Sequence, residues 1–161
     1  MGLFGAVGEA VVIKDIGVVN ADVTGQWYVG NLVGTHYGTV SNSYSTGNVT
    51  GEGYVGGLVG GSAGSVSNSY STGGVTGDSH VGGLVGWNGG TVSNSFWDSE
   101  TSGQATSAGG TGKATAEMMN IATFTAAAWN ITAVASGHTN PDYIWNTVSA
   151  VTYPFLSWQG V

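Results

Sequence analysis

The chain has 161 residues, of which 41% are hydrophobic, and this length and composition suit one domain with a buried core. Only 7% of the residues are charged, 30 are glycine, and the formal net charge is -7. The two cationic side chains, Lys14 and Lys113, are too few for the basic surface that a nucleic acid or an anionic membrane requires. There is no cysteine, which excludes disulfides and thiolate metal sites.

The first residues lack a basic segment followed by a long apolar run, so the sequence shows no signal peptide. No apolar stretch is long enough to span a bilayer, and we expect no membrane insertion. We expect either that a leader has been removed or that the chain is a segment of a larger protein.

A repeat with a period of 26 residues organises most of the chain. Each copy contains a Val-Gly-x-Leu-Val-Gly run, a turn ending in glycine, and a serine-rich run with β-branched residues. The regular copies are residues 26–51, 52–77 and 78–103, and residues 1–25 form a degenerate, more apolar first copy without a polar cap. A fixed period of this length indicates one supersecondary unit stacked on copies of itself.

Three alignments place the degenerate copy in phase with the next one: Leu3-Phe4-Gly5 with Leu32-Val33-Gly34, Ile13 with Val40, and Val23 with Val49. Valine, threonine and aromatic residues bounded by glycine turns predict short strands, and we expect three in each copy. One copy buries too little apolar surface to be stable alone, whereas stacked copies add backbone hydrogen bonds between parallel strands. The sequence therefore predicts an all-β fold, a parallel β-solenoid of about four coils.

The inward face of the serine-rich strand is left open by the sequence. Strict alternation places Val66, Asn68 and Tyr70 on one face and the serines between them on the other, but a bend at Asn68 inverts the later residues. We favour the bend, with Asn42, Asn68 and Asn94 forming an amide ladder at a corner. The handedness of the coil is also open, although crossover chirality favours a right-handed one.

Residues 104–161 are predicted to form an irregular C-terminal cap. We expect a loop that leaves the stack up to Gly112, a short helix over residues 115–120 with Thr115 as N-cap, and a second, Ala-rich turn over residues 124–129. The segment is rich in large aromatic residues suited to covering the last coil. These residues are Trp129, Tyr143, Trp145, Tyr153, Phe155 and Trp158.

The repeat resembles the GLUG-motif family, named for its Gly-Leu-Val/Phe-Gly core, which stands here as residues 57–60 and 83–86. The flanking Val-Ser-Asn-Ser-Tyr-Ser-Thr-Gly run and the tail from Phe96-Trp97-Asp98 to Tyr153-Pro154 also resemble that family. The resemblance implies a secreted or surface-attached microbial protein, adhesin-like or part of a surface peptidase, in which the repeats are scaffold. It supplies no catalytic residue.

We predict no enzymatic activity, catalytic residue, cofactor or metal site. A solenoid lyase or hydrolase needs a basic residue or a carboxylate pair in a groove, and no such pair recurs on one strand face. The histidines, His36, His80 and His138, occupy unrelated repeat positions and lack a zinc motif. Residues 109–115 only faintly resemble a phosphate-binding loop, and we interpret them as a turn.

Two surface chemistries stay open as minor alternatives. Acidic residues at turns could bind calcium, although we expect them to be simply solvated: Asp22, Glu52, Asp78, Asp98 and Glu100. Serine columns could bind ice if they face outward: Ser41, Ser67 and Ser93, and Ser43, Ser69 and Ser95. Asn48 and Asn130 begin glycosylation sequons, which matter only in a glycosylating pathway.

Our first hypothesis is a stiff extracellular or cell-surface rod that joins copies of itself head to tail, because uncapped strand edges recruit other chains. The predicted assembly faces comprise Leu3, Phe4, Val11, Ile13, Trp145, Phe155 and Trp158. The alternative is an adhesin fragment that binds glycans or a host surface through an exposed aromatic column. That column comprises Trp27, Tyr28, Tyr54 and His80.

Overall fold

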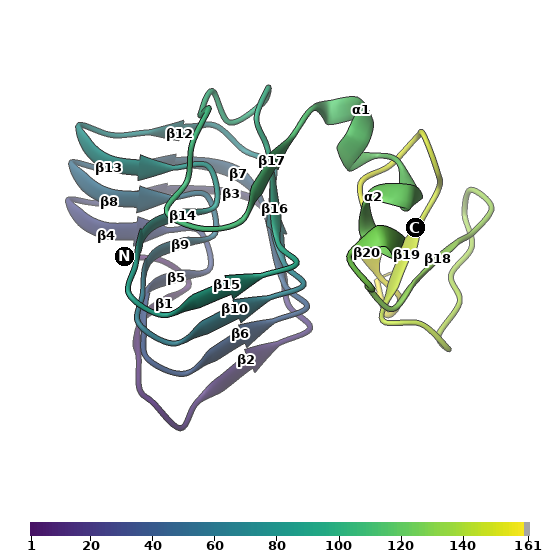
Figure 1. The fold of residues 1–161 in the computed structure, drawn as a ribbon, viewed down its shortest axis with the longest axis horizontal. Coiled ribbons are helices and arrows are strands. Elements are labelled where there is room, and N and C mark those ends of the chain that lie inside the picture. Colours follow the sequence, from purple (N-terminus) through teal and green to yellow (C-terminus); the bar gives the residue numbers. More distant parts are fainter. Residues whose placement is uncertain (160–161) are drawn as a thin grey trace. The chain divides into compact units, whose positions relative to one another are not determined.

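The computed structural model describes residues 1–159, and the chain divides into two compact units, Met1–Lys113 and Ala114–Val161. The first unit is a parallel β-solenoid of about four turns with a period of about 26 residues (Figure 1). It extends beyond the predicted boundary at residue 103, because the following residues stay hydrogen-bonded to the last coil. The Thr111 N–H, for example, donates to the Ser95 carbonyl over 3.0 Å.

The solenoid has four parallel sheets, each named here by its first strand. The β1 sheet contains β1 (Phe4–Val7), β5 (Val33–His36), β9 (Val59–Ser62) and β14 (Val85–Asn88). The β2 sheet contains β2 (Val12–Lys14), β6 (Thr39–Ser41), β10 (Ser65–Ser67) and β15 (Thr91–Ser93). The β4 sheet contains β4 (Trp27–Gly30), β8 (Gly53–Gly56) and β13 (Ser79–Gly82).

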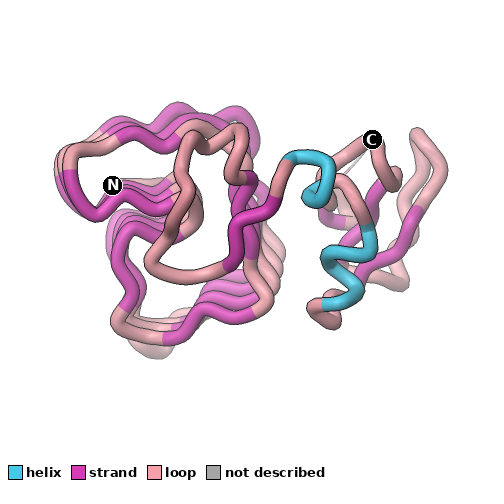
Figure 2. The backbone as a smooth tube through the Cα atoms, turned by 45° about the horizontal axis from the view of Figure 1, so that its top comes forward, coloured by secondary structure: helices cyan, strands magenta, loops and turns pink. Residues whose placement is uncertain are grey.

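The β3 sheet has the most irregular strands. It contains β3 (Gly17–Thr24), β7 (Tyr44–Thr50), β11 (Tyr70–Ser71), β12 (Val75–Thr76), β16 (Phe96–Asp98) and β17 (Thr111–Lys113). The coils lie almost directly behind one another when the stack is tilted (Figure 2). Like residues therefore lie over like residues along each sheet.

The predicted register of the degenerate first copy is confirmed. The paired positions are Phe4 with Val33, Ile13 with Val40, and Val23 with Val49. The extra residues of the first copy are absorbed inside β3, whose pairing with β7 shifts between Val18 and Ala21. Apolar periodicity was sufficient to set the register, because a slip moves every inward side chain to the other face of its sheet.

The prediction of three strands in each copy is wrong, because the Val-Gly-x-Leu-Val-Gly run turns a corner in its middle. In the third copy it supplies the ends of β8 and β9, which belong to different sheets. A Cβ on Gly56 would lie 2.1 Å from the Val59 carbonyl oxygen, so no side chain fits at this corner. The corner leaves Leu58 fully buried in the core.

The predicted bend in the serine-rich run is confirmed, since Asn42, Asn68 and Asn94 all have a φ of 47°. Asparagine adopts this left-handed conformation more readily than other residues with a Cβ. Beyond the bend the serines at 43, 69 and 95 are buried, which rules out the minor alternative of an ice-binding column at these positions. A buried column cannot bind ice.

The inward serines complete the backbone hydrogen bonding at this corner. The Ser43 N–H donates to Ser69 Oγ and the Ser69 N–H donates to Ser95 Oγ, each over 3.2 Å. Ser69 Oγ in turn donates to the Ser67 carbonyl over 2.7 Å. Each hydroxyl thus satisfies groups that the bend removes from the regular ladder.

Two apolar clusters run along the inside of the solenoid. The larger one contains Val7, Ile13, Leu32, Val33, Val40, Leu58, Val59, Val66, Leu84, Val85 and Trp97. The smaller one contains Val29, Val49, Val55 and Val75. Two valine columns, one with Val29 and Val55 and the other with Val49 and Val75, are therefore buried in a separate cluster from the leucine column of Leu32, Leu58 and Leu84.

The second unit has its own aromatic core and a small mixed sheet. Its elements are α1 (Thr115–Met118), α2 (Ile121–Ala126), β18 (Ile131–Ala133), β19 (Trp145–Thr147) and β20 (Phe155–Leu156). The ring of Trp129 lies 4.8 Å from that of Phe124 and 4.9 Å from that of Trp145, centre to centre. Trp129 and Trp145, which were predicted to cover the last coil, thus pack against each other and, for Trp129, against Phe124 within the unit.

The helices also differ in detail from the prediction. The N-cap of α1 is Ala114, not Thr115, and Ala114.N donates to the Glu117 carboxylate over 3.0 Å. The second helix begins at Ile121, earlier than predicted, because Asn120 Oδ1 accepts from Ala122.N over 3.0 Å and caps it.

Candidate functional sites: an aromatic column and two unlike ends

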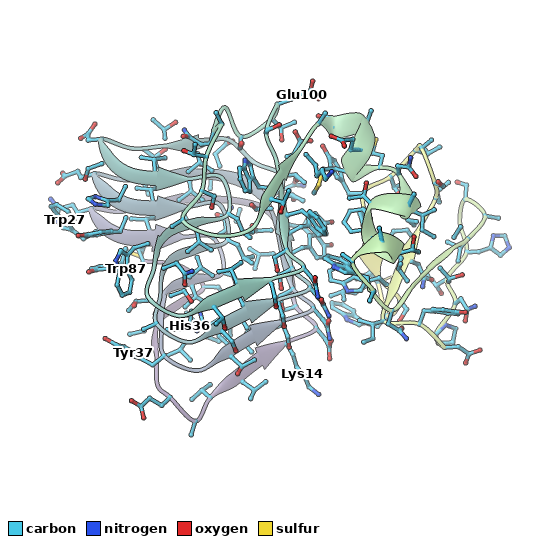
Figure 3. The ribbon with its side chains drawn as sticks, in the orientation of Figure 1. Lys14, Trp27, His36, Tyr37, Trp87 and Glu100 are labelled. Carbon is cyan, nitrogen blue, oxygen red and sulfur yellow. The ribbon has the colours of Figure 1, made fainter. Side chains whose placement is uncertain are left out.

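The predicted aromatic column is present on the outside of the β4 sheet. The rings of Tyr28 and Tyr54 are stacked with centroids 4.6 Å apart, and His80 lies 4.6 Å beyond Tyr54 at a tilt of 34°. Trp27 is 6.0 Å from Tyr54, is 55% exposed, and points away from the stacked coils (Figure 3). The structure therefore brings together all four residues that the sequence singled out.

The backbone of this column is in an unusual conformation. Tyr28, Tyr54 and His80 have φ values of 51°, 53° and 50°. A left-handed conformation costs a bulky residue roughly 1–3 kcal/mol, whereas stacking returns about 0.5–1.5 kcal/mol for each aromatic pair. Asn42, Asn68 and Asn94 adopt the same left-handed conformation, which asparagine tolerates. At Tyr28, Tyr54 and His80 this conformation costs free energy.

The C-terminal end of the solenoid is covered by residues 102–113. The Val75 N–H donates to the Ser102 carbonyl, and the Gly83 N–H donates to the Thr106 carbonyl, over 3.1 and 3.0 Å. The β17 strand then pairs with β16. In Figure 2 the loop that leads to the first helix crosses the near end of the stack. The expectation of a loop leaving the stack is wrong, because this backbone bonds to edge strands of two sheets: β12 and β16 of the β3 sheet and, through the Ala108 N–H and the Val85 carbonyl, β14 of the β1 sheet.

Trp97 fills the interior at this covered end. It pairs in register with Ser71, which pairs with Ser45 and so with Val18 in the coils below. The indole lies against Gly83, where a Cβ would be 2.0 Å from its ring, and is only 5% exposed. Its Nε1 donates to the Gln104 carbonyl over 2.9 Å.

The same column contains related hydrogen bonds in the coils below Trp97. Ser45 Oγ donates to the Gly57 carbonyl over 2.9 Å, and Ser71 Oγ donates to the Gly83 carbonyl over 2.7 Å. Ser45, Ser71 and Trp97 thus each donate from the side chain to a backbone carbonyl that comes later in the sequence. Val18, at the N-terminal end of the column, has no donor to offer.

The N-terminal end is open by comparison. Within the described residues, β1, β2 and β3 each pair with a strand on one side only. Exposed apolar side chains lie along this edge, with Leu3 60%, Val11 46% and Val12 60% exposed. An edge of this kind presents unpaired backbone groups beside apolar surface, which favours pairing with another chain.

A hollow of about 370 Å³ lies at this open end, beside Val18. Its lining is largely apolar, from Met1, Leu3, Val18 and Val23, with Asp22, Thr24 and Asn31 as polar members. Asn31 is 1% exposed, and its Nδ2 donates to the Gly47 carbonyl over 2.9 Å. Its buried Oδ1 has no hydrogen-bond partner. The sequence did not predict this hollow, although Asn31 marks the place, since it stands where the next two copies have Gly57 and Gly83.

The predicted assembly residues do not all lie on the surface. Leu3, Phe4 and Val11 are exposed as expected, but Ile13 is 5% exposed and belongs to the core. Trp145 is completely buried in the sheet of the second unit, so its assignment to an assembly face is also wrong. Trp158 is 65% exposed.

His36 is a buried titratable residue that the sequence left without a role. It lies inside the solenoid (Figure 3), between Val7 and Ser62 in register. Neither ring nitrogen has a hydrogen-bond partner of normal geometry, and Ser62 Oγ lacks one too. Burial lowers the pKa of His36 below its ordinary value of 6.5, and the nearby Gly38 backbone opposes part of this shift. The ring is therefore neutral.

The turn acids do not gather into one site. Among residues 1–159, no group of three or more histidine or acidic side chains is placed to hold a metal ion. Asp98, expected to be solvated, is instead buried, and its Oδ1 accepts from the Glu100 and Thr101 N–H groups over 2.9 and 3.0 Å. It stabilises the turn that starts the covering segment. The described helices include none long and apolar enough to cross a membrane.

The fold and the columns define a β-solenoid repeat protein. A family model of the GLUG motif matches residues 51–76, which form the third coil and contain Tyr54 and Ser71. The protein is thus a β-solenoid repeat protein with a GLUG motif in its third coil. Neither the curated proteins nor the solved structures include a match to the chain.

Proposed function

We propose that the protein is a non-enzymatic structural module of the cell surface or extracellular space, a stiff β-solenoid that joins copies of itself head to tail. The observation that carries this proposal is the difference between its ends. The strands β1, β2 and β3 have open edges beside exposed apolar residues, whereas at the C-terminal end residues 102–113 cover edge strands of the β1 and β3 sheets. A contact between unlike surfaces continues from one copy to the next, as in a filament or ring.

A concentration series tests this proposal by multi-angle light scattering and negative-stain electron microscopy. We expect the mean mass to rise with concentration and elongated particles to form. The double variant Leu3→Lys, Val12→Lys places charges on the open edge and should keep the protein monomeric. Tyr37→Lys is the matched control, since Tyr37 is 57% exposed and lies outside the strands of this edge. Monomers of the wild type at every concentration would refute self-assembly.

A second candidate function is ligand binding by the aromatic column, and the left-handed backbone of its three stacked members favours it. Strained residues concentrate at binding sites, and aromatic rings with neighbouring carboxylates and amides suit sugars. Glu52 and Gln26, whose side chains are hydrogen-bonded over 3.4 Å, precede two column members in sequence. Glycan-array binding should be lost in Tyr54→Ala and kept in Tyr37→Ala, and a wild-type protein that binds no glycan refutes this function.

A further inference from the structure

We propose that the partner of the aromatic column is a cationic glycan, a polymer of amino sugars with free amino groups. This inference rests on the second function proposed above, glycan binding by the column, and it names the class of sugar. The class follows from which ring faces are free, which charges lie beside them, and where the cationic residues of the chain lie.

The stacked rings of the column leave little free ring face for a neutral sugar. Tyr54 lies between Tyr28 and His80, with a ring centroid 4.6 Å away on each side. The rings of Tyr28 and Tyr54 are nearly parallel, with an angle of 11° between their planes, so each covers a face of the other. The C–H groups of a neutral sugar pack on the negative face of a ring, and these faces are already occupied.

Trp27 supplies the main free ring face. One side of its indole lies over the first residue of β8, since a Cβ on Gly53 would be 2.4 Å from the ring. The side chain is 55% exposed and points away from the stacked coils (Figure 3). A tryptophan face is the best cation–π acceptor among side chains, and the attraction persists at an exposed site. A cationic group therefore gains more from this face than a neutral one.

Two carboxylates lie beside this indole at one repeat position. Glu52 directly precedes the glycine under the indole, and its Oε1 accepts from Nε2 of Gln26, the residue before Trp27, over 3.4 Å. Asp78 lies one coil further, where its N–H donates to the Glu52 carbonyl over 3.1 Å. Both acidic side chains are exposed. Like charges one coil apart repel each other, whereas a cation near both is attracted by both.

The sheet that bears the column has no cationic side chain to neutralise these carboxylates. The chain has two such residues, Lys14 in β2 and Lys113 in β17, and these strands belong to the β2 and β3 sheets. The described strands of the β4 sheet, β4, β8 and β13, contain neither lysine nor arginine. Charge complementarity therefore selects a cationic partner for this face.

An amino sugar fits the surface better than a lysine-rich peptide. The Gln26 amide and the Ser79 hydroxyl lie near the indole, since a Cβ on Gly53 would be 3.1 Å from Ser79 Oγ. The hydroxyls of a pyranose ring can exchange hydrogen bonds with both groups while its amino group meets the carboxylates. A lysine side chain offers only its terminal ammonium group and loses more rotamer freedom when it is held in place.

The first experiment compares two sugars of equal length by isothermal titration calorimetry of the full chain. The probes are a glucosamine hexamer and its fully N-acetylated form, at about pH 6, where amino and carboxyl groups are charged. We expect the free amine to bind about 10-fold more tightly, and about 1 M salt to remove most of this preference. Equal affinities would overturn the inference and leave glycan binding intact, whereas binding of neither sugar would refute glycan binding itself.

The second experiment assigns the preference to the two carboxylates. The double variant Glu52→Gln, Asp78→Asn should lose most of the preference and bind the N-acetylated hexamer as the wild type does. Glu9→Gln is the matched control, since Glu9 is an exposed acid in the turn after β1 and should leave the preference unchanged. A double variant that keeps the full preference would overturn the inference.

Two further titrations test the ring and the class of partner. Trp27→Ala should weaken binding of the glucosamine hexamer about 3-fold or more, while Tyr37→Ala should not. A lysine hexapeptide, which carries the same number of side-chain amines, should bind less tightly than the glucosamine hexamer. Tighter binding of the peptide would overturn the glycan as the occupant of this face.

Discussion

The two ends of the solenoid are finished differently: a segment of the chain covers part of the C-terminal end, whereas the first strands at the N-terminal end have unpaired edges. At the C-terminal end, a serine column becomes Trp97, and residues 102–113 return over the last coil. At the N-terminal end, the same column ends in Val18 beside a hollow, and three strands have open edges. A stacked repeat has no intrinsic end, so termination has to be built by residues that break the period.

The strongest test of this contrast removes the plug. Trp97→Ala should lower the free energy of unfolding by about 3–5 kcal/mol, since it leaves a cavity and removes the hydrogen bond to Gln104. Trp27→Ala, on the exposed column, should change it by less than about 1 kcal/mol. Urea denaturation followed by circular dichroism measures both, and equal effects would mean that the covered end is not specially stabilised.

A smaller effect should separate the middle of the stack from its open end. Ser69→Ala leaves the buried Ser43 N–H without an acceptor and should cost about 1–3 kcal/mol. Ser43→Ala affects Ile16.N, which is only partly buried at the open end, and should cost about 1 kcal/mol or less because water can replace the hydroxyl. Chemical denaturation of both variants decides this, and the reverse order would contradict the inferred difference in solvent access.

His36 lies one coil inward from the open end and should make stability depend on pH. The lowered pKa means that the native state binds fewer protons than the unfolded state, so stability is retained above about 6.5 and falls as the pH drops through that value. His36→Val should flatten this dependence and raise stability at neutral pH by about 1 kcal/mol, because it removes unpartnered polar atoms.

Thermal melts between pH 8 and pH 5 measure this effect. His80→Ala is the control, since His80 is exposed in the aromatic column. An unchanged pH dependence in His36→Val would show that other groups are responsible for it.

The smallest effect on stability is expected at the open edge itself. The double variant Leu3→Lys, Val12→Lys should change the free energy of unfolding of the monomer by less than about 0.5 kcal/mol per site, since both side chains are about 60% exposed. Its effect should instead be on association. A large loss of monomer stability in dilute solution would mean that these side chains support the first coil rather than a contact.

Much of the fold could be predicted because the same residue pattern occurs in four copies of the repeat. The period, the register of the first coil and the bend at Asn68 all followed from aligned apolar, glycine and asparagine positions. The aromatic column followed in the same way, since Tyr28, Tyr54 and His80 occupy one repeat position. These are local signals, and each copy reinforces them.

The departures from the repeat could not be predicted in the same way. Residues 102–113 lack an apolar pattern because their backbone, not their side chains, holds them to the last coil. The burial of Ile13 followed from its alignment with Val40, although we assigned it to an assembly face. The burial of Trp145 could not be predicted, because its segment has no repeat to align with. The hollow depends on Asn31, whose unpartnered oxygen is visible only once its surroundings are known.

The sequence by itself determined the 26-residue coil, because side-chain alternation and glycine turns act over a few residues and recur. Only the tertiary structure decided how each end is finished, because that depends on which backbone groups find partners between distant segments. Trp97 and Asn31 illustrate the difference: each is a single substitution in a repeated column, and its consequence is set by whether another segment lies over it.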